Sequence, residues 1–228
     1  MLILWDIDGT LLNTNGTGPD AFRQTAREYF KSDLPELRFG GATDSGLLRQ
    51  LTDHFGRDPL SSEEFDEFIG SYVNRLKVGM NHEDFTGTLF PGALELLRRV
   101  EQAGGAHQSL LTGNAKLGAE AKLDHYDIWH ELDHASGAYG DDHHDRNELG
   151  PIALARSFAR TGRQFAGEEV LVIGDTARDV QCAAAIGARC LAVTSGGVDG
   201  HTLKQEGAWR VCDDLNEVSV GELLGSGG

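Results

Sequence analysis

The feature that most constrains the fold of this chain is a series of short apolar runs, each followed by a turn and then by residues with helical spacing. The runs are Leu2–Ile7, His107–Leu111, Val170–Ile173 and Cys190–Val193. Nearly continuous apolar strands of this length are typical of parallel strands that are buried on both faces of a sheet. Because these strands alternate with helices, the sequence predicts an α/β fold with a doubly wound, Rossmann-like parallel sheet.

Ordinary helix signals occupy the stretches between the runs. Pro91–Gln102 begins with a proline in its first turn, carries apolar residues three positions apart and ends before two glycines. We predict further core helices at Arg146–Arg160 and Ala177–Ile186.

One long segment breaks the alternation of strands and helices. Residues 14–85 contain no convincing strand pattern but three amphipathic stripes, and the third opens with a capping box at Ser61 and Glu64. We therefore predict an all-α helical domain at residues 14–85, inserted into a core domain formed by residues 1–13 and 86–224. The glycine-rich residues 225–228 are predicted to form a tail.

Charge and composition argue against several classes of partner. The formal net charge of −16 at pH 7 disfavours a nucleic acid, which binds clustered Lys and Arg. The same charge disfavours an anionic membrane surface, and no apolar run approaches the roughly 18 residues of a membrane span. The three cysteines form no CxxC pair and no export signal precedes the first apolar run, so we expect a cytoplasmic protein.

Polar residues follow the predicted strands where ligands bind in such folds, beyond the carboxyl ends of the strands. Thr112 and Asn114 follow the second run, and four acids lie at or beyond the ends of the first and third runs, namely Asp6, Asp8, Asp175 and Asp179. Four carboxylates at one rim repel each other unless a cation lies among them. Because hard oxygen ligands of this kind select Mg²⁺, the sequence predicts a Mg²⁺ site at these four aspartates.

Three stretches carry a resemblance to a known family: LILWDIDGTLL at the start, LLTGN in the middle and VIGDTARDVQCAAAIGA near the end. They match the strand followed by DxDGT, the Thr that closes the second strand, and the GDxxxD acidic loop of the haloacid dehalogenase (HAD) superfamily. The chain resembles this superfamily over almost its whole length, in the branch with a small α-helical cap that includes phosphoglycolate phosphatases and β-phosphoglucomutases. The resemblance implies that the inserted helices of residues 14–85 are this cap domain.

The chain departs from the pattern of the superfamily at one motif. A Lys followed by Pro is usual upstream of the acidic loop, and no Lys-Pro occurs here. Arg146, at the start of a predicted helix, is our candidate for this phosphate-binding cation, with Lys116 and Lys122 as alternatives.

The resemblance also implies roles for the individual residues. Asp6 would be the nucleophile that forms an aspartyl-phosphate, and Asp8 would be the general acid and base. Mg²⁺ would be held by the Asp6 carboxylate, the Asp8 backbone carbonyl and Asp175, with Asp179 nearby or acting through water. Phosphoryl oxygens would be bound by Thr112, by the backbone around Gly113 and by Arg146.

Other candidate substrate-binding residues are less clearly assigned. Asn114 is a candidate substrate ligand, but it would equally well cap the helix that follows it. In the cap, Thr43, Asp44 and Arg49 occupy the region where such caps contact the substrate, and Thr43 or Asp44 would equally well cap a helix.

The function predicted from these residues is Mg²⁺-dependent hydrolysis of a small phosphorylated metabolite, a phosphate monoester. Asp8 argues against a dehalogenase, because a halide leaving group needs no proton. A phosphomutase shares all of the core residues and is the main alternative, and a catalytically silent binding module on the same fold is a third. The identity of the substrate and the oligomeric state are left open.

Overall fold

The computed structural model describes residues 1–225 of the chain, and residues 226–228 of the predicted tail lie outside the described residues. Its centre is a five-stranded sheet in the order β4-β1-β5-β6-β7, in which every neighbouring pair is parallel. The strands are β1 (Leu2–Trp5), β4 (His107–Leu110), β5 (Val170–Gly174), β6 (Arg189–Val193) and β7 (Arg210–Cys212). The prediction of a doubly wound parallel sheet is therefore confirmed.

Strand β7 was not predicted from the sequence. It is a three-residue edge strand, and two of its residues, Arg210 and Val211, are only partly buried. A short edge strand needs no continuous apolar run, because only one of its sides pairs with a neighbour. The pattern that identified the central strands is therefore absent from it.

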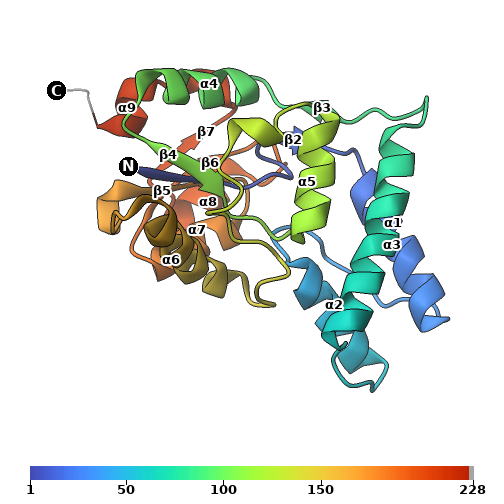
Figure 1. Cartoon of the computed structure of the whole chain (residues 1–228). Coiled ribbons are helices and arrows are strands. Elements are labelled where there is room, and N and C mark those ends of the chain that lie inside the picture. Colours follow the sequence, from blue (N-terminus) through green and yellow to red (C-terminus); the bar gives the residue numbers. More distant parts are fainter. Residues whose placement is uncertain (226–228) are drawn as a thin grey trace.

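Helices cover both faces of the sheet (Figure 1). In β1, Ile3 and Trp5 pack with α4 (Ala93–Ala103), α5 (Lys116–His125) and α9 (Val220–Leu224). Leu2 and Leu4 pack on the opposite face with α6 (Leu149–Thr161), α7 (Ala177–Ala185) and α8 (Gly200–Gln205). Alternate side chains of a strand point to opposite faces, so one short strand serves two hydrophobic cores.

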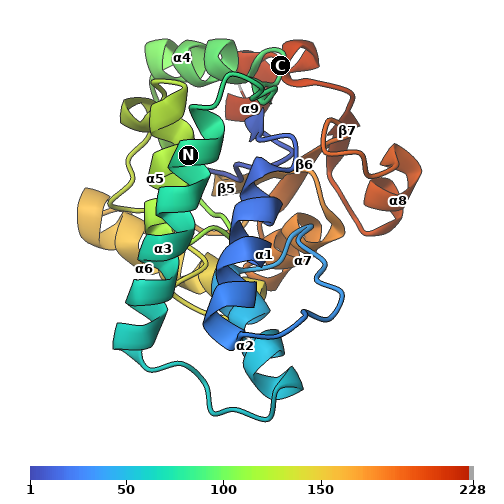
Figure 2. The same cartoon turned by 90° about the vertical axis from the view of Figure 1, so that its right-hand side faces the viewer.

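A second body of helices lies beyond the carboxyl ends of these strands, on the right of Figure 1. It contains α1 (Thr17–Phe30), α2 (Asp44–His54) and α3 (Ser62–Met80), which form a third hydrophobic cluster. Figure 2 shows α1 and α3 side by side in front of the sheet. The capping box of Ser61 and Glu64 is present at the start of α3, as predicted.

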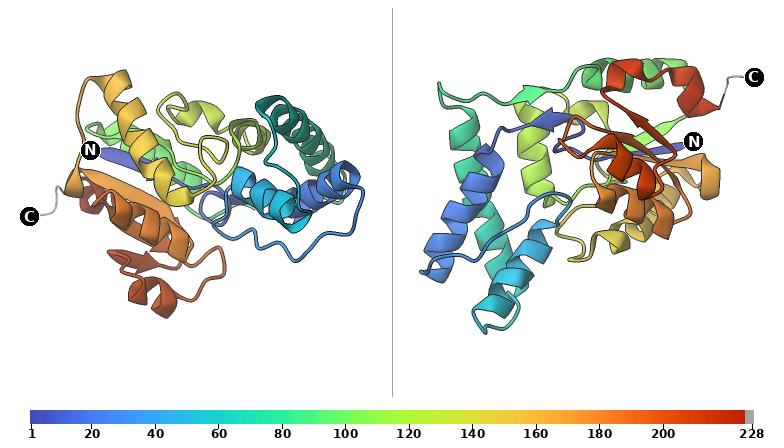
Figure 3. Two further views of the ribbon diagram at one scale, coloured as in Figure 1. Left: turned by 90° about the horizontal axis from the view of Figure 1, so that it is seen from below. Right: turned by 180° about the vertical axis from the view of Figure 1, so that it is seen from behind.

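Two short segments of the chain connect the helical body to the sheet. They pair as an antiparallel ribbon of β2 (Leu12–Asn13) and β3 (Thr88–Leu89), which is visible from behind in Figure 3. All three helices lie within residues 14–85, the segment that we continue to propose as a cap domain. Among the described residues, no helix has the length and apolar character needed to cross a bilayer.

Candidate active site

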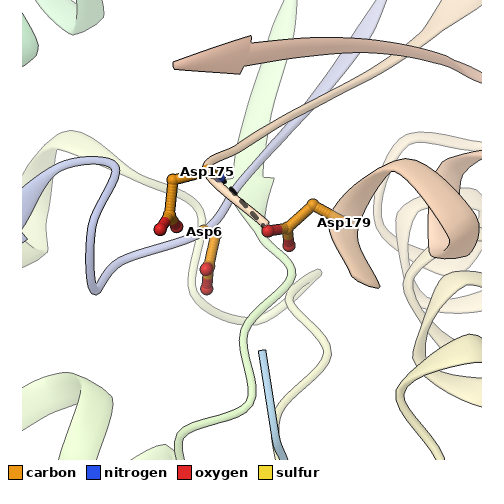
Figure 4. Close-up of side chains that lie close together, drawn as sticks. All are labelled: Asp6, Asp175 and Asp179. Carbon is orange, nitrogen blue, oxygen red and sulfur yellow. Dashed lines mark hydrogen bonds between the residues drawn. The ribbon is translucent and has the colours of Figure 1, made fainter. Parts of the chain in front are cut away.

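Three of the predicted acids meet at the carboxyl ends of neighbouring strands. Asp6 follows β1, Asp175 follows β5, and Asp179 lies in the first turn of α7 (Figure 4). One carboxylate oxygen of each lies within 4.8 Å of those of the other two, and each residue is at most 4% exposed. Because β1 pairs directly with β5, the sheet brings together acids from segments that are far apart in the chain.

Arg146 is the buried cation of this cluster. Its Nη2 lies 3.2 Å from Asp6 Oδ1 and also contacts Asp179 Oδ1. Burial raises the pKa of Asp6, and Arg146 lowers it by a smaller amount. Burial also raises the pKa of Asp175, followed by the nearby charges of Asp179 and Asp6. One arginine therefore does not balance three buried carboxylates.

The cluster fits a divalent cation. Its donors are carboxylate oxygens, the ligands that Mg²⁺ prefers, and they carry more negative charge than Arg146 supplies. Two glycines close tightly around Asp175: a Cβ on Gly9 or Gly196 would lie 2.2 Å or 1.7 Å from its Oδ2. Only residues without a side chain allow these two loops to enclose the carboxylate.

Asp179 is largely occupied by protein donors. Its Oδ2 accepts hydrogen bonds from the backbone amides of Thr176 and Asp175, at 2.9 and 3.2 Å, and from the Thr176 hydroxyl at 2.7 Å. Its Oδ1 accepts from Arg146. Asp179 therefore positions both the acidic loop and the arginine.

A second ionic network surrounds Asp8. The Lys122 ammonium lies 2.6 Å from Asp8 Oδ2 and 2.6 Å from Asn114 Oδ1, and it is only 3% exposed. The Asn114 amide donates at 2.8 Å both to Asp8 Oδ2 and to Thr112 Oγ1. Lys122, Asn114 and Thr112 thus hold Asp8 by a chain of hydrogen bonds.

The three candidate cations of the sequence lie in different places. Arg146 and Lys122 both line the cavity described below, beside Asp6 and Asp8 respectively. Lys116 lies over the ring of Tyr139, 5.7 Å from its centroid, and does not line the cavity.

The acids and cations open into a cavity of about 260 Å³ between the sheet and the helices α1–α3. Residues from both bodies form its walls; the core supplies Asp6, Asp8, Gly113, Asn114, Lys122, Arg146 and Asp175, and the helical body supplies Phe39, Asp44, Leu47 and Tyr72. A cavity of this kind suits a small ligand.

Four of the predicted site residues do not line this cavity: Asp179, whose contacts are given above, and Thr112, Thr43 and Arg49. Thr112 is fully buried and its hydroxyl accepts from Asn114. The Thr43 hydroxyl caps α2 at the Gly46 amide, 3.0 Å away, and donates to the His144 carbonyl at 2.7 Å. Arg49 is exposed and lies beside the His144 ring. The structure therefore gives Thr43 and Arg49 partners outside the cavity.

The first turn of α2 is hydrogen-bonded to two core loops. The Asp44 amide donates to the Gly113 carbonyl at 2.8 Å, and the Ser45 amide donates to the Gly140 carbonyl at 3.2 Å. A Cβ on Gly113 would lie 1.9 Å from the Ala42 carbonyl oxygen, and one on Gly140 would lie 1.8 Å from the Gly113 carbonyl oxygen. The absence of side chains at both glycines allows this close approach.

Sequence reasoning missed several residues that line the cavity, among them Tyr72 and Ser195. Tyr72 belongs to an apolar stripe of α3 and carries no local sign of a second role. Ser195 follows β6, and its hydroxyl donates to the Gly9 carbonyl at 2.7 Å. Its place directly after a parallel strand was a signal that could have identified it.

Comparisons with known proteins identify a family and similar folds. The family model described as haloacid dehalogenase-like hydrolase matches residues 3–184. A phosphoglycolate phosphatase of Pseudomonas savastanoi pv. phaseolicola is 26% identical over 235 residues, which cover 97% of this chain and 79% of the relative. A hydrolase structure from Pseudomonas syringae has a TM-score of 0.66 at 22% identity and covers 93% of each chain. A Bacteroides vulgatus structure described as a candidate beta-phosphoglucomutase has a TM-score of 0.70 at 20% identity and covers 99% of this chain and 88% of its own.

Proposed function

Since this chain belongs to the haloacid dehalogenase-like hydrolase family, we propose that it is a Mg²⁺-dependent phosphatase of small phosphate monoesters that works through an aspartyl-phosphate. The observation that carries the proposal is the meeting of Asp6, Asp175 and Arg146 in one cavity, with Asp8 beside them. The relative named phosphoglycolate phosphatase supports phosphate ester hydrolysis as the reaction.

In the proposed reaction, an Asp6 carboxylate oxygen forms a bond to phosphorus while the bond from phosphorus to the ester oxygen breaks. Asp8 donates a proton to the departing alkoxide. Asp8 then accepts a proton from a water molecule, whose oxygen bonds to phosphorus as the bond from Asp6 breaks and phosphate leaves.

Charge neutralisation is the other requirement of phosphoryl transfer. Asp6 and Asp175 would hold Mg²⁺, which supplies positive charge to the phosphoryl oxygens when bound. Arg146, which lies beside Asp6, would bind the same oxygens from the protein side. Lys122 and Asn114 would keep the Asp8 carboxylate in position.

A phosphomutase remains the alternative, because the cavity is roofed by residues of the helical body that could shield an aspartyl-phosphate from water. If adding a hexose bisphosphate primes isomerisation of a sugar phosphate, the mutase is favoured over the phosphatase. The substrate of either enzyme would be a small metabolite, with no nucleic acid or membrane as partner. All three cysteines are free and buried, in keeping with the predicted cytoplasmic location.

Hydrolysis of p-nitrophenyl phosphate with Mg²⁺ or with a chelator tests this proposal. We expect Mg²⁺-dependent release, and we expect Asp6→Asn to lower it about a thousandfold or more while the fold is retained. Asp53→Asn, at an exposed acid of α2, is the matched control and should keep wild-type turnover. Folded wild-type protein without metal-dependent release would instead favour a silent binding module.

A further inference from the structure

Asp44 is a buried acid of the cavity that the proposed chemistry does not use. It is 7% exposed and lines the cavity from the start of α2. Its Oδ2 accepts a hydrogen bond from the Ala115 amide at 2.7 Å. Within residues 1–225, no donor is hydrogen-bonded to its Oδ1. Tyr72, which is 2% exposed, lines the same cavity, and its hydroxyl likewise has no hydrogen-bond partner among the described residues.

The described residues of the cavity offer no unpaired cationic side chain to a second anionic group of a substrate. In the described part of the chain, Arg146 and Lys122 are the only cations that line it. Arg146 is already paired with Asp6 and Asp179, and Lys122 is paired with Asp8. Four acids line the cavity against these two cations; with all four ionised, this is an excess of two negative charges, which one divalent ion cancels. A phosphoryl group then adds negative charge of its own.

A substrate carboxylate would therefore enter a buried site whose two cationic side chains are already paired, and it would lie close to Asp44, an arrangement that costs free energy. A hydroxyl or ammonium group would instead donate to the free oxygen of Asp44. Phe39 and Leu47 supply an apolar wall for the carbon atoms between this group and the phosphate.

We propose that the alcohol half of the substrate is not anionic and presents a hydrogen-bond donor, a hydroxyl or an ammonium group, to Asp44 and Tyr72. This inference rests on the proposed phosphatase function and narrows its substrate class. It predicts that phosphoglycolate, for which relatives are named, is a poor substrate of this chain.

Three two-carbon esters test the proposal because they differ in one terminal group. They are 2-hydroxyethyl phosphate, phosphoethanolamine and 2-phosphoglycolate. With Mg²⁺ and the full chain, we expect kcat/KM to be about tenfold or more higher for at least one of the first two than for phosphoglycolate. A phosphoglycolate value equal to or above both others would overturn the proposal.

The Asp44→Asn variant tests the residue itself. An amide keeps the size of the side chain and an acceptor for Ala115, but it removes the charge. We expect the preference over phosphoglycolate to fall about tenfold, most strongly for phosphoethanolamine. Asp141→Asn is the matched control, since Asp141 lies within electrostatic range of Asp44 but does not line the cavity, and its preference should equal that of the wild type. If Asp44→Asn keeps the wild-type preference over phosphoglycolate, other residues select the substrate and the proposed role of Asp44 is refuted.

A binding measurement separates this inference from the proposed function. Titration calorimetry of the three esters into Mg²⁺-loaded Asp6→Asn should give the same rank order of affinity without turnover. If p-nitrophenyl phosphate is hydrolysed but phosphoglycolate binds and reacts best of the three esters, the inference about the substrate fails and the proposed phosphatase function stands. If no phosphate ester is hydrolysed by the wild type, the proposed function fails, and the affinities still decide whether the cavity rejects a carboxylate.

Discussion

Two buried cations neutralise different aspartates at the centre of this molecule. Arg146 contacts Asp6 and Asp179, whereas Lys122 contacts Asp8. Both cations are at least 96% buried, so each would be costly without its partner. Removing one member of a buried ion pair leaves the other member desolvated and unpaired, which is the expensive outcome.

Replacing Arg146 by Gln should therefore destabilise the protein and weaken phosphate binding. We expect the free energy of unfolding to fall by about 3 kcal/mol, because two buried carboxylates lose their cation. Lys116→Gln, which removes a cation outside the cavity, should change it by less than about 0.5 kcal/mol. Urea denaturation measures both changes, and inhibition by inorganic phosphate should weaken only in the Arg146 variant. Equal inhibition in the two variants would contradict the assignment of Arg146.

Asp44 predicts a pH dependence of stability. Burial raises its pKa from 3.8 to about 6, although the Ala115 amide and Lys122 lower it, and Asp8 and Asp141 add to the rise. Between pH 4 and 6 the folded state then binds more protons than the unfolded state, so this group lowers stability as the pH rises. From pH 4.5 to pH 7, the Asp44 carboxyl group should lower the free energy of unfolding by about 2 kcal/mol.

Asp44→Asn should remove this part of the pH dependence. Urea denaturation at pH 4.5 and pH 7 should show the variant gaining about 2 kcal/mol relative to the wild type over this interval. Asp53→Asn changes an exposed acid of the same helix and should follow the wild-type profile. Parallel profiles for all three proteins would show that Asp44 titrates as it does in the unfolded chain.

At the level of elements, helix α2 is held by the core through its first turn. Backbone hydrogen bonds connect Asp44 to Gly113 and Ser45 to Gly140, and the Asp44 carboxylate accepts from the amide that precedes α5. These bonds place Asp44 in the cavity, while the side chains of Thr43 and Arg49 turn to His144. The contact depends on glycine at positions 113 and 140.

Gly140→Ala should loosen this contact. Its added Cβ would lie 1.8 Å from the Gly113 carbonyl oxygen, which forces the two loops apart. We expect a loss of about 1–3 kcal/mol in unfolding free energy, as for other overpacked sites, together with faster proteolysis of residues 14–85. Gly70→Ala is the control, because nothing lies within 4 Å of its Cβ position in α3, and it should be neutral or stabilising. Equal stability of the two variants would mean that the two loops move apart without a loss of unfolding free energy.

For the whole molecule, the acidic cluster joins segments that are far apart in the chain. Asp6 follows the first strand and Asp175 the third of the sheet in chain order, and β1 pairs with β5. A cation bound between them would connect these two distant segments of the core. A ligand that binds only the folded state stabilises it by mass action.

Mg²⁺ should therefore raise the melting temperature, and a chelator should reverse the change. At a concentration about a hundredfold above its dissociation constant, the ion should add about 2.7 kcal/mol to the free energy of unfolding. Asp175→Asn should lose most of this stabilisation, whereas Asp53→Asn should keep it. Differential scanning calorimetry with and without Mg²⁺ makes the comparison, and an equal shift in both variants would exclude Asp175 as a ligand.

The sequence by itself determined the layered α/β fold and the acids that gather at its rim. Apolar runs such as Val170–Ile173 reveal buried parallel strands, and the polar residue after such a strand must lie at the carboxyl edge of the sheet. Both signals are local, so Asp6 and Asp175 could be expected to meet before any coordinates existed.

Only the tertiary structure decided which cation pairs with which acid and which residue of the helical body reaches the cavity. Arg146 pairs with Asp6 and Lys122 with Asp8 across more than a hundred residues, and no local pattern encodes such partners. Asp44 enters the cavity while its neighbour Thr43 does not, because the hydrogen bonds of α2 to the core loops set the direction of each side chain. Contacts between elements, and not the spacing of residues within them, therefore determine the chemistry of this site.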